Sequence, residues 1–584
     1  MKELKYLNKY LIKYRKRLLL GFFIVIIARI LLLFTPGLIR NSVNVVELYL
    51  NGTNVSVNDV QFELVKNIFL ILAASISAGI FTFLTRQTII NVSRFVEFDL
   101  KNEIFVQYQN LSMNFYKKNR TGDLMNRISE DVSKVRMYVG PAIMYSINTF
   151  TLIAITLFYM FRQSPELTLY TVCPLPILSF AIFKISRKIN QKSKIVQESI
   201  SKLSSFSQEI FSAIKIIKSY AIQETTKKKF NDISKLNKHN QIDLVRIQAM
   251  FFPLMIFLIG ISNLFVIYIG GSKYLDGSIQ QLGIIAEFII YVNMLTWPVA
   301  SLGWISSVVQ QAEASQKRIN EFLKQKNDIL QQDKISKNIS GKIEVKNLSF
   351  EYDDSGIKAL KKINFYLEAG NSLGIIGSTG SGKTSLINIL LRTLDFDNGE
   401  ILIDDLSIKK FDIQKLRAQI GIVNQDSFLF SDSISNNIRF GAKEADMTNI
   451  VKVSKICSIH NEIINFNDKY NTLLGERGVN LSGGQKQRLC MARALIKNPK
   501  ILILDDCLSA LDNKTENEIL KKIKKTYKSS SKIIVSHRVS SIQDCDKIIV
   551  MDDGEIIQTG KHNDLINTNG YYKNLFIDQS NNKD

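Results

Sequence analysis

Two patterns of apolar residues divide the chain into a first and a second half. Residues 1 to about 315 contain several apolar stretches of about 20 residues, the length that crosses the hydrocarbon core of a bilayer. From about residue 340 onward the apolar runs are short and are separated by polar turns. A chain of 584 residues is also too long for one globular core. The pattern predicts a helical membrane domain followed by a second, water-soluble domain.

Apolar length and loop charge together predict six membrane spans. They cover about residues 18–40, 65–90, 141–162, 166–186, 250–271 and 282–306. The segments 91–140 and 187–249 are polar and helical in period, so we expect the spanning helices to continue into the cytosol. The predicted domain boundaries are 1–315 for the membrane domain, 316–340 for a polar linker and 341–584 for the second domain.

The basic residues of the first half lie in alternate loops. The chain carries 75 Lys and Arg against 53 Asp and Glu, a net charge of +22. A nucleic-acid partner is one interpretation of such a charge. The segments 1–17, 94–137 and 184–246 are rich in Lys and Arg, whereas the intervening loops are poor in them. This distribution follows the positive-inside rule. It predicts a multi-pass protein of the cytoplasmic membrane with both termini in the cytosol, and no nucleic-acid partner.

The charged residues inside predicted spans include Arg29 in the first and Glu287 in the last. A charge within the bilayer is costly and usually faces a bundle interior or a water-filled cavity. One interpretation is contact with substrate or ions. The other is structural pairing, or a side chain that reaches the membrane surface.

The second half contains a phosphate-binding loop. A buried strand over Ser372–Ile376 precedes the pattern G-x-x-x-x-G-K-[ST], and an amphipathic helix follows to about Leu394. Backbone N–H groups of such a loop converge on phosphates, the lysine reaches the β- and γ-phosphates, and the hydroxyl after it ligates Mg²⁺. The predicted nucleotide-binding residues here are Gly377, Ser378, Thr379, Gly380, Ser381, Gly382, Lys383, Thr384 and Ser385.

Two carboxylates end the apolar run Ile501–Leu504, which has the length of a buried parallel strand. Asp505 is placed to hold Mg²⁺, directly or through water. Asp506 is placed to act as general base or to position the attacking water. The sequence therefore predicts a site that binds and hydrolyses a nucleotide.

A second loop-to-helix motif narrows the class of ATPase. Ser482, Gly483, Gly484 and Gln485 open a helix that runs to about Lys497. Its N-terminus cannot serve the phosphate loop of the same chain, because that loop has its own helix. We expect it to close over ATP that is bound to a second cassette.

With these motifs in this order, nearly the whole chain resembles an ABC exporter half-transporter, in which six spans precede one ATP-binding cassette. The resemblance implies an all-α six-helix transmembrane domain, an α/β P-loop NTPase cassette, and ATP and Mg²⁺ as cofactors. It also implies that Tyr352 stacks on adenine and that His537 contacts the γ-phosphate. Gln425 would couple the γ-phosphate site to the membrane domain and join Thr384 and Asp505 at the metal.

The resemblance extends to four segments that connect the parts of an exporter. They are an exporter-specific loop, a loop between the two cassettes, and two intracellular coupling regions: Gly475–Gly478, Ser509–Asp512, Phe115–Leu124 and Ser207–Glu224. By resemblance the coupling regions push on the cassettes, and the second reaches the partner.

One position departs from the family pattern. Members normally carry Glu where this chain has Asp506, whereas the signature Ser482–Gln485 is intact. Loss of one methylene withdraws the carboxylate by about 1–1.5 Å, roughly one C–C bond. Misplacement on that scale costs on the order of 10²-fold in rate. The combination resembles the degenerate subunit of heterodimeric bacterial multidrug exporters.

We therefore expect ATP-driven export of a hydrophobic or amphipathic drug, lipid or peptide by a heterodimer whose other chain carries Glu. Two alternatives stay open. One is a homodimeric lipid flippase that hydrolyses ATP with Asp506, and the other is an ATP-gated membrane protein that does not pump. The sequence does not identify the substrate.

Overall fold

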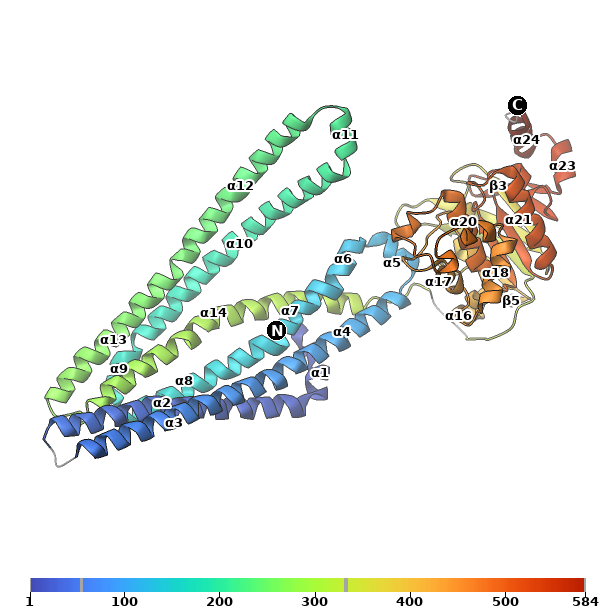
Figure 1. Ribbon diagram of the computed structural model, residues 1–584. Coiled ribbons are helices and arrows are strands. Elements are labelled where there is room, and N and C mark those ends of the chain that lie inside the picture. The colour runs from blue at the N-terminus through green and yellow to red at the C-terminus, as the bar shows by residue number, and fades with distance from the viewer. Residues whose placement is uncertain (1, 53–55, 330–333, 397, 582–584) are drawn as a thin grey trace. The chain divides into compact units, whose positions relative to one another are not determined.

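The computed structural model describes residues 2–52, 56–329, 334–396 and 398–581. The chain divides into two compact units: Met1–Gln109 with Arg120–Gln325, and Asn110–Asn119 with Lys326–Asp584. The described part of the first unit is helical, and the described strands all lie in the second (Figure 1). We describe each unit by itself.

The first unit consists of long helices. In chain order they are α1 (Asn8–Lys13), α2 (Arg15–Leu50), α3 (Val57–Thr85), α4 (Asn91–Asn110), α6 (Thr121–Asn126), α7 (Val132–Met137), α8 (Ile143–Gln163), α9 (Pro165–Val172), α10 (Pro174–Ser212), α11 (Ile214–Ser219), α12 (Gln223–Ala249), α13 (Phe251–Leu275) and α14 (Gly283–Leu323). Three π-helical turns, Arg86–Ile90, Arg127–Asp131 and Tyr138–Ala142, join α3 to α4, α6 to α7 and α7 to α8. Such turns are frequent at functional sites.

Five helical stretches in the described residues are long and apolar enough to cross a membrane. They are Arg15–Leu50, Val57–Asn110, Thr121–Gln163, Gln223–Leu275 and Gly283–Leu323. The remaining expected span, 166–186, which is the fourth along the chain, is divided between α9 and α10 at Cys173, because Pro174 supplies no backbone N–H. Cys173 itself keeps helical dihedral angles, φ −49° and ψ −40°, so the direction of the chain is maintained. The helical membrane domain is confirmed, and the count of six is not contradicted.

The membrane helices are apolar inside and outside. Phe288, Tyr291 and Leu295 of α14 belong to the buried core. Phe69 on α3 and Phe252 on α13 are 67% and 64% exposed. Large apolar side chains on the outer face suit a lipid surface. Glu287 is buried and forms an ion pair with Arg40 of α2 at 3.1 Å. Of the two interpretations of this charge within a span, the structure thus shows structural pairing.

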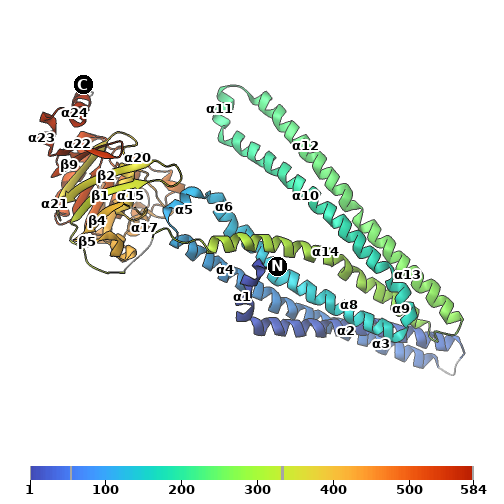
Figure 2. The same ribbon diagram turned by 180° about the vertical axis from the view of Figure 1, so that it is seen from behind.

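Helices α10 and α12 form a long hairpin with α11 at its tip (Figures 1 and 2). Lys192 bonds Asp243 at 2.9 Å across the hairpin, and Ser199 donates to Asn237 at 2.9 Å. The tip coincides with the expected coupling region Ser207–Glu224. Its apolar side chains are exposed, with Phe211 and Tyr220 each at 75%.

The second unit contains two sheets. Their strands are β1 (Ile343–Glu351), β2 (Lys358–Leu367), β3 (Ser372–Gly377), β4 (Asn398–Ile403), β5 (Leu406–Ser407), β6 (Ile420–Val423), β7 (Ile501–Asp505), β8 (Ser531–Val535), β9 (Lys547–Asp552) and β10 (Glu555–Gly560). The order β2-β1-β4-β5 is antiparallel, and the other sheet has the order β10-β9-β3-β8-β7-β6. In the larger sheet only β10 runs antiparallel to its neighbour.

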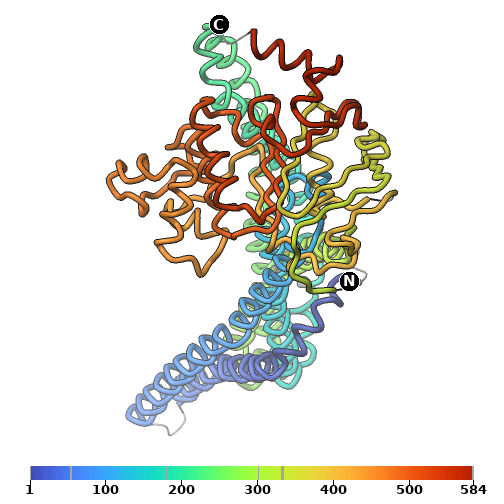
Figure 3. Tube along the Cα trace, turned by 90° about the vertical axis from the view of Figure 1, so that its right-hand side faces the viewer, coloured from blue at the N-terminus to red at the C-terminus, as the bar shows by residue number. Residues whose placement is uncertain are grey.

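Helices follow and alternate with these strands along the chain. They are α15 (Lys383–Leu390), α16 (Ile413–Ala418), α17 (Ile434–Arg439), α18 (Met447–Ile456), α19 (His460–Ile464), α20 (Gly483–Leu495), α21 (Asn513–Thr526), α22 (Val539–Ile542), α23 (His562–Asn567) and α24 (Tyr571–Asn581). Successive residues of β7 enter different cores: Ile501 and Ile503 one, Leu502 and Leu504 the other. The segment near residues 340–400 and the helices near 445–480 lie on opposite flanks of the unit (Figure 3). The expected α/β P-loop fold of the second domain is confirmed.

Candidate functional site at the edge of the parallel sheet

Four adjacent parallel strands end at one edge of the larger sheet. β3 ends at Gly377, β8 at Val535, β7 at Asp505 and β6 at Val423. The residues that follow these ends meet at the same edge, where α/β sheets usually bind ligands. The structure thus gathers the phosphate loop, His537, the two carboxylates and Gln425 on one edge. They were predicted from segments up to 160 residues apart along the chain.

The phosphate loop depends on glycine at two points of close backbone approach. A Cβ at Gly377 would lie 2.0 Å from the carbonyl oxygen of Met551, and one at Gly382 would lie 2.3 Å from that of Ala359. Gly380 and Gly382 also have positive φ angles of 85° and 95°, which other residues rarely adopt. The loop therefore has the open backbone that a phosphate group requires, and α15 starts directly behind it.

Lys383 lies folded against its own loop. Its Nζ donates to the carbonyl oxygens of Gly377 at 3.0 Å and Ser378 at 2.7 Å. Burial lowers the pKa of this amine, while the carboxylates of Asp505 and Asp506 oppose that shift. The three charged groups are therefore close enough to interact, as expected for a lysine and two carboxylates around one triphosphate.

Asp505 is the buried carboxylate of the pair. Burial, and then the charge of Asp506, raise its pKa to about 6, and Lys383 partly offsets this. A divalent cation would reverse the shift. Thr384 and Gln425 are exposed at the same edge, and among the described residues neither side chain forms a hydrogen bond. Carboxylate, hydroxyl and amide oxygens are suitable Mg²⁺ ligands when phosphates complete the set. The residues present therefore fit an ATP–Mg²⁺ group.

Asp506 has an unusual backbone conformation. Its φ angle is +45°, and its N–H donates to the carbonyl oxygen of Val535 at 2.9 Å. Asp is one of the few non-glycine residues that enter the left-handed region readily. The sharp turn after β7 fixes where the side chain starts, so a carboxylate on a shorter side chain reaches less far.

Tyr352 follows β1 and lies over the start of α15. Its hydroxyl shares a hydrogen bond with Ser385 at 2.9 Å, and Phe350 packs edge-on against its ring at 4.9 Å. The ammonium of Lys117, on α5 (Met113–Lys118), lies 4.6 Å from the ring centroid. Both α5 and Tyr352 belong to the second unit. The aromatic ring is thus anchored beside the phosphate loop, with a cation on it.

The signature Ser482–Gln485 forms the N-terminal cap of α20. The backbone N–H of Gln485 donates to Ser482 Oγ at 3.3 Å, and Gln485 Oε1 accepts from the Ser482 N–H at 2.9 Å. Glu462 then ties the helix to α19 by bonding Gln485 and, through both oxygens, Arg488. Ser482 and Gly483 are exposed. An exposed, rigid helix N-terminus attracts anions.

The loop Ser509–Asp512 is fastened to α20. Gln487 Oε1 accepts from the Ala510 N–H at 3.1 Å, and Gln487 Nε2 donates to Ser509 Oγ at 3.3 Å. A Cβ at Gly484 would lie 3.1 Å from the Ala510 carbonyl oxygen, so a larger residue would push the loop away. The expected inter-cassette loop and the signature helix therefore form one assembly.

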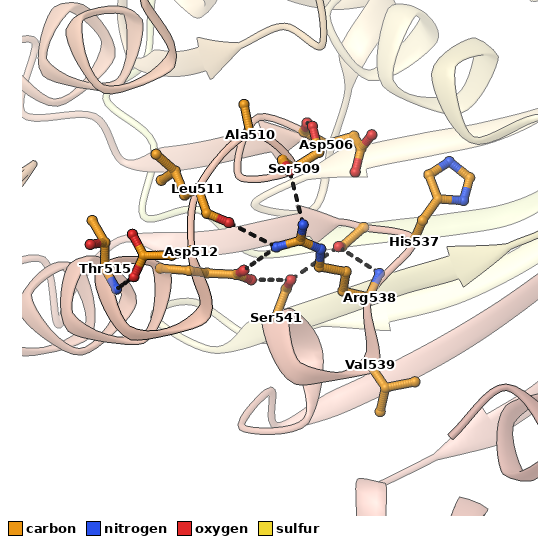
Figure 4. Close-up of polar contacts among 12 residues, drawn as sticks. Asp506, Ser509, Ala510, Leu511, Asp512, Thr515, His537, Arg538, Val539 and Ser541 are labelled. Atoms are coloured by element: carbon orange, nitrogen blue, oxygen red, sulfur yellow. Dashed lines mark hydrogen bonds and ion pairs between the residues drawn. The ribbon is translucent and has the colours of Figure 1, made fainter. Parts of the chain in front are cut away.

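Arg538 supports the same loop from below (Figure 4). Its guanidinium donates to the carbonyl oxygens of Ser509 at 2.9 Å and Leu511 at 3.0 Å, and pairs with buried Glu516 at 3.2 Å. Ser541 also donates to Glu516. The neighbouring His537 ring is exposed and, in the part of the chain described, makes no hydrogen bond. Sequence reasoning missed Gln487, Glu516 and Arg538, because none belongs to a short motif.

A helical membrane domain fused to a P-loop cassette with its own signature defines an ATPase-coupled membrane transporter. The description "ABC transporter transmembrane region" matches residues 18–299, and "ABC transporter" matches residues 360–509. The chain is 35% identical over 582 residues to the multidrug resistance-like ATP-binding protein MdlA of Buchnera aphidicola (Schizaphis graminum), covering 99% of this chain and 98% of that protein. It therefore belongs to the ABC transporter family and is an exporter-type, multi-pass subunit.

Two further comparisons agree. The ATP-dependent lipid A-core flippase of Syntrophus aciditrophicus is 34% identical over 479 residues, which cover 81% of this chain and 79% of the flippase. A solved bacterial Atm1-family ABC exporter with ATP bound matches with a TM-score of 0.80, over 97% of this chain and 99% of that one. At 22% identity the second likeness concerns the fold alone.

Proposed function

We propose that this chain is one half of an ATP-driven exporter of hydrophobic or amphipathic molecules, and that it supplies the impaired ATP site of a heterodimer. The membrane domain would comprise residues 1–315, the linker 316–340 and the cassette 341–584, with the cassette and both termini on the cytosolic side of the cytoplasmic membrane. The names of the multidrug and lipid-exporting relatives support this class of substrate.

The roles of the site residues follow from their placement. The backbone of Gly377–Thr384 would hold the phosphates, with Lys383 turning from its loop carbonyls towards the β- and γ-oxygens. Tyr352 would stack on the base. Thr384, Asp505 and Gln425 would hold Mg²⁺, which neutralises phosphate charge when bound. His537 would contact the γ-phosphate, and Asp506 would orient the attacking water.

Two features support a dimer. The exposed cap Ser482–Gln485 belongs to a helix other than the one behind the phosphate loop, so a second chain is needed to bring a signature to each ATP. The hairpin tip around α11 exposes Phe211 and Tyr220, which is costly in water unless a partner covers them. The signature of this chain would then serve the partner's site.

The main argument for a heterodimer is that this chain has Asp506 where the family normally has Glu. With its backbone fixed by the turn after β7, the carboxylate reaches about 1–1.5 Å less far than that of Glu. A partner that carries Glu would then perform most of the turnover, using the intact signature of this chain.

Purification of the tagged chain from its native membrane, followed by mass spectrometry of the complex, tests this assignment. A stoichiometric second half-transporter with Glu at the position of Asp506 supports it. A complex that holds only this chain, and hydrolyses ATP, contradicts it. It would instead favour a homodimeric flippase that works with Asp506, an alternative suggested by the lipid-flipping relative. ATP binding without vectorial transport in inside-out vesicles would favour a gated, non-pumping protein.

A further inference from the structure

A half-enclosed cavity of about 130 Å³ lies in the membrane unit beside α2, α3 and α8. A cavity needs only about 10–15 Å³ of such volume to admit one water, so this one admits several waters or a compact polar group. Arg29 of α2 and Arg86, the first residue of a π-helical turn, line it together with Tyr145 and Asn148 of α8. No carboxylate lines it.

Two buried polar atoms on the side chains that line the cavity lack hydrogen-bond partners. Arg29 is half-buried, and its Nε is a buried donor without a hydrogen bond. The Oδ1 of Asn148 is likewise buried and unbonded. Among the described residues, neither Arg29 nor Arg86 forms an ion pair. A buried polar group without a partner costs free energy, and a charge within the bilayer costs more.

Arg40, on the same helix, provides the contrast. It lies beyond Arg29 along α2 and is paired with Glu287 at 3.1 Å. Of the two arginines in the expected span 18–40, Arg40 is therefore compensated by a carboxylate of the protein, whereas Arg29, at about the middle of the span, faces a cavity with a second cation. An anion that comes from outside the chain would compensate both guanidinium groups, of which that of Arg29 is half-buried and that of Arg86 exposed.

From this cluster we propose that Arg29 and Arg86, with Asn148, bind the anionic headgroup of an amphipathic substrate, a phosphate or a carboxylate. The inference rests on the proposed export function and names the chemical class of its cargo. Guanidinium groups bind such oxyanions through paired, charge-assisted hydrogen bonds. The π-helical turn at Arg86 widens the helix at this point, and such turns recur at functional sites. The apolar part of the ligand would lie against the neighbouring pair Tyr145 and Trp304, whose rings meet edge-on at 5.5 Å.

The test uses the purified full-length complex in nanodiscs of phosphatidylcholine. Fluorescence anisotropy measures binding of a short-chain phosphatidate with a label on its acyl chain, and of the matched phosphatidylcholine. We expect the phosphatidate to bind at least tenfold more tightly. Arg29→Gln should remove that preference, since a charged hydrogen bond is worth about tenfold or more in affinity. Arg29→Lys should keep part of it.

Two further variants make the result specific. Arg86→Gln changes an exposed side chain of the same cavity, so it tests the site even if Arg29→Gln does not fold. Arg162→Gln removes the same charge at the exposed end of α8, away from the cavity, and should keep the full preference. Equal binding of the two lipids by the wild-type complex overturns the inference. So does a preference that survives both cavity variants.

Inorganic phosphate distinguishes the source of the anion. Displacement of the labelled phosphatidate only by a large excess of inorganic phosphate supports a headgroup of an amphipathic ligand. Displacement at equal concentration overturns it in favour of a soluble anion. Mg-ATPase of the wild-type complex separates this inference from the proposed function. If the complex hydrolyses ATP but shows no lipid preference, only the proposed headgroup site is disproved. If the complex has no ATPase activity, the proposed function is disproved.

Discussion

Gln487 accepts a hydrogen bond from the backbone N–H of Ala510 at 3.1 Å, and so fastens the loop after Asp506 to the signature helix of the same cassette. In the proposed dimer these two elements would serve different ATP molecules. The loop follows the carboxylate of this chain's own site, whereas the signature would close on the partner's ATP. A movement of either element would therefore be transmitted to the other through the Gln487 side chain, beside the close approach of Gly484 to Ala510.

Replacement of Gln487 should uncouple the two elements. Gln487→Ala removes both bonds to the loop, leaves the Ala510 N–H unpaired, and should lower the ATPase of the complex about fivefold to tenfold. Binding of ATP to this chain should be unaffected. Gln414→Ala, an exposed glutamine of α16, is the matched control and should leave turnover unchanged. Wild-type turnover in Gln487→Ala would contradict the coupling.

The two contributions of this chain to hydrolysis can be separated. In a heterodimer Asp506→Asn should change steady-state ATPase less than about twofold, because the site is already impaired. Ser482→Arg should abolish most of it, since it places bulk and positive charge where the signature meets the partner's γ-phosphate. The measurement is ATPase of the purified complex with each substitution singly. If both substitutions abolish ATPase activity equally, the complex is instead a homodimer that hydrolyses ATP with Asp506. If Ser482→Arg leaves turnover near normal, the signature does not close over ATP.

Lys383 should be needed for nucleotide binding at this chain's own site. Lys383→Ala removes the ammonium that would turn towards the β- and γ-phosphates, and should lower affinity by about tenfold or more. Photolabelling of this chain with an azido-ATP analogue measures the loss. Lys443→Ala, an exposed lysine beyond α17, should label as the wild type does. Unchanged labelling of Lys383→Ala would show that the lysine has been assigned wrongly.

Glu516 should stabilise the cassette through Arg538. Its side chain is 1% exposed, so Glu516→Ala leaves the Arg538 guanidinium without its carboxylate and Ser541 without its acceptor. We expect a loss of about 3 kcal/mol, the low end for a buried pair because Arg538 is 38% exposed. For a domain of this size the melting temperature should fall on the order of 6–12 °C. Calorimetry of the full-length complex measures it, with the exposed Glu518→Ala as a control that should melt like the wild type.

Membrane orientation can be measured with single cysteines. In a Cys173→Ser background, a cysteine at Asn51 should react with an impermeant thiol reagent added outside intact cells, and a cysteine at Glu224 should not. Asn51 follows α2 in a loop poor in basic residues, whereas Glu224 lies near the hairpin tip in a basic segment. Labelling of Glu224→Cys alone would reverse the orientation.

The phosphate loop and the buried strand before Asp505 could be predicted because their geometry is local. Fixed glycine spacing sets the backbone, and five consecutive buried residues in β7 fit only a strand covered on both faces. The convergence of His537 and Gln425 on one sheet edge followed from resemblance to a family. Their own sequence surroundings carry no such information.

Other features depend on contacts that no short pattern encodes. Glu516 and Arg538 are 22 residues apart and belong to residue types that usually face water, so their partly buried pairing appears only once α21 packs below the loop. The division of the fourth span at Cys173 could not be predicted from the sequence either. Pro174 indicates a kink, but hydropathy does not distinguish a kinked span from two helices.

The exposed aromatic residues of the α11 tip should also affect how long an unassembled subunit survives in the cell. A subunit that is synthesised before its partner exposes Phe211 and Tyr220 to the cytosol. Such exposed apolar surface is typical of incompletely folded proteins. Chaperones and proteases recognise such surfaces, so an excess of one subunit would be degraded rather than stored. In the proposed heterodimer, exposure of these two side chains would therefore favour balanced synthesis of the two subunits.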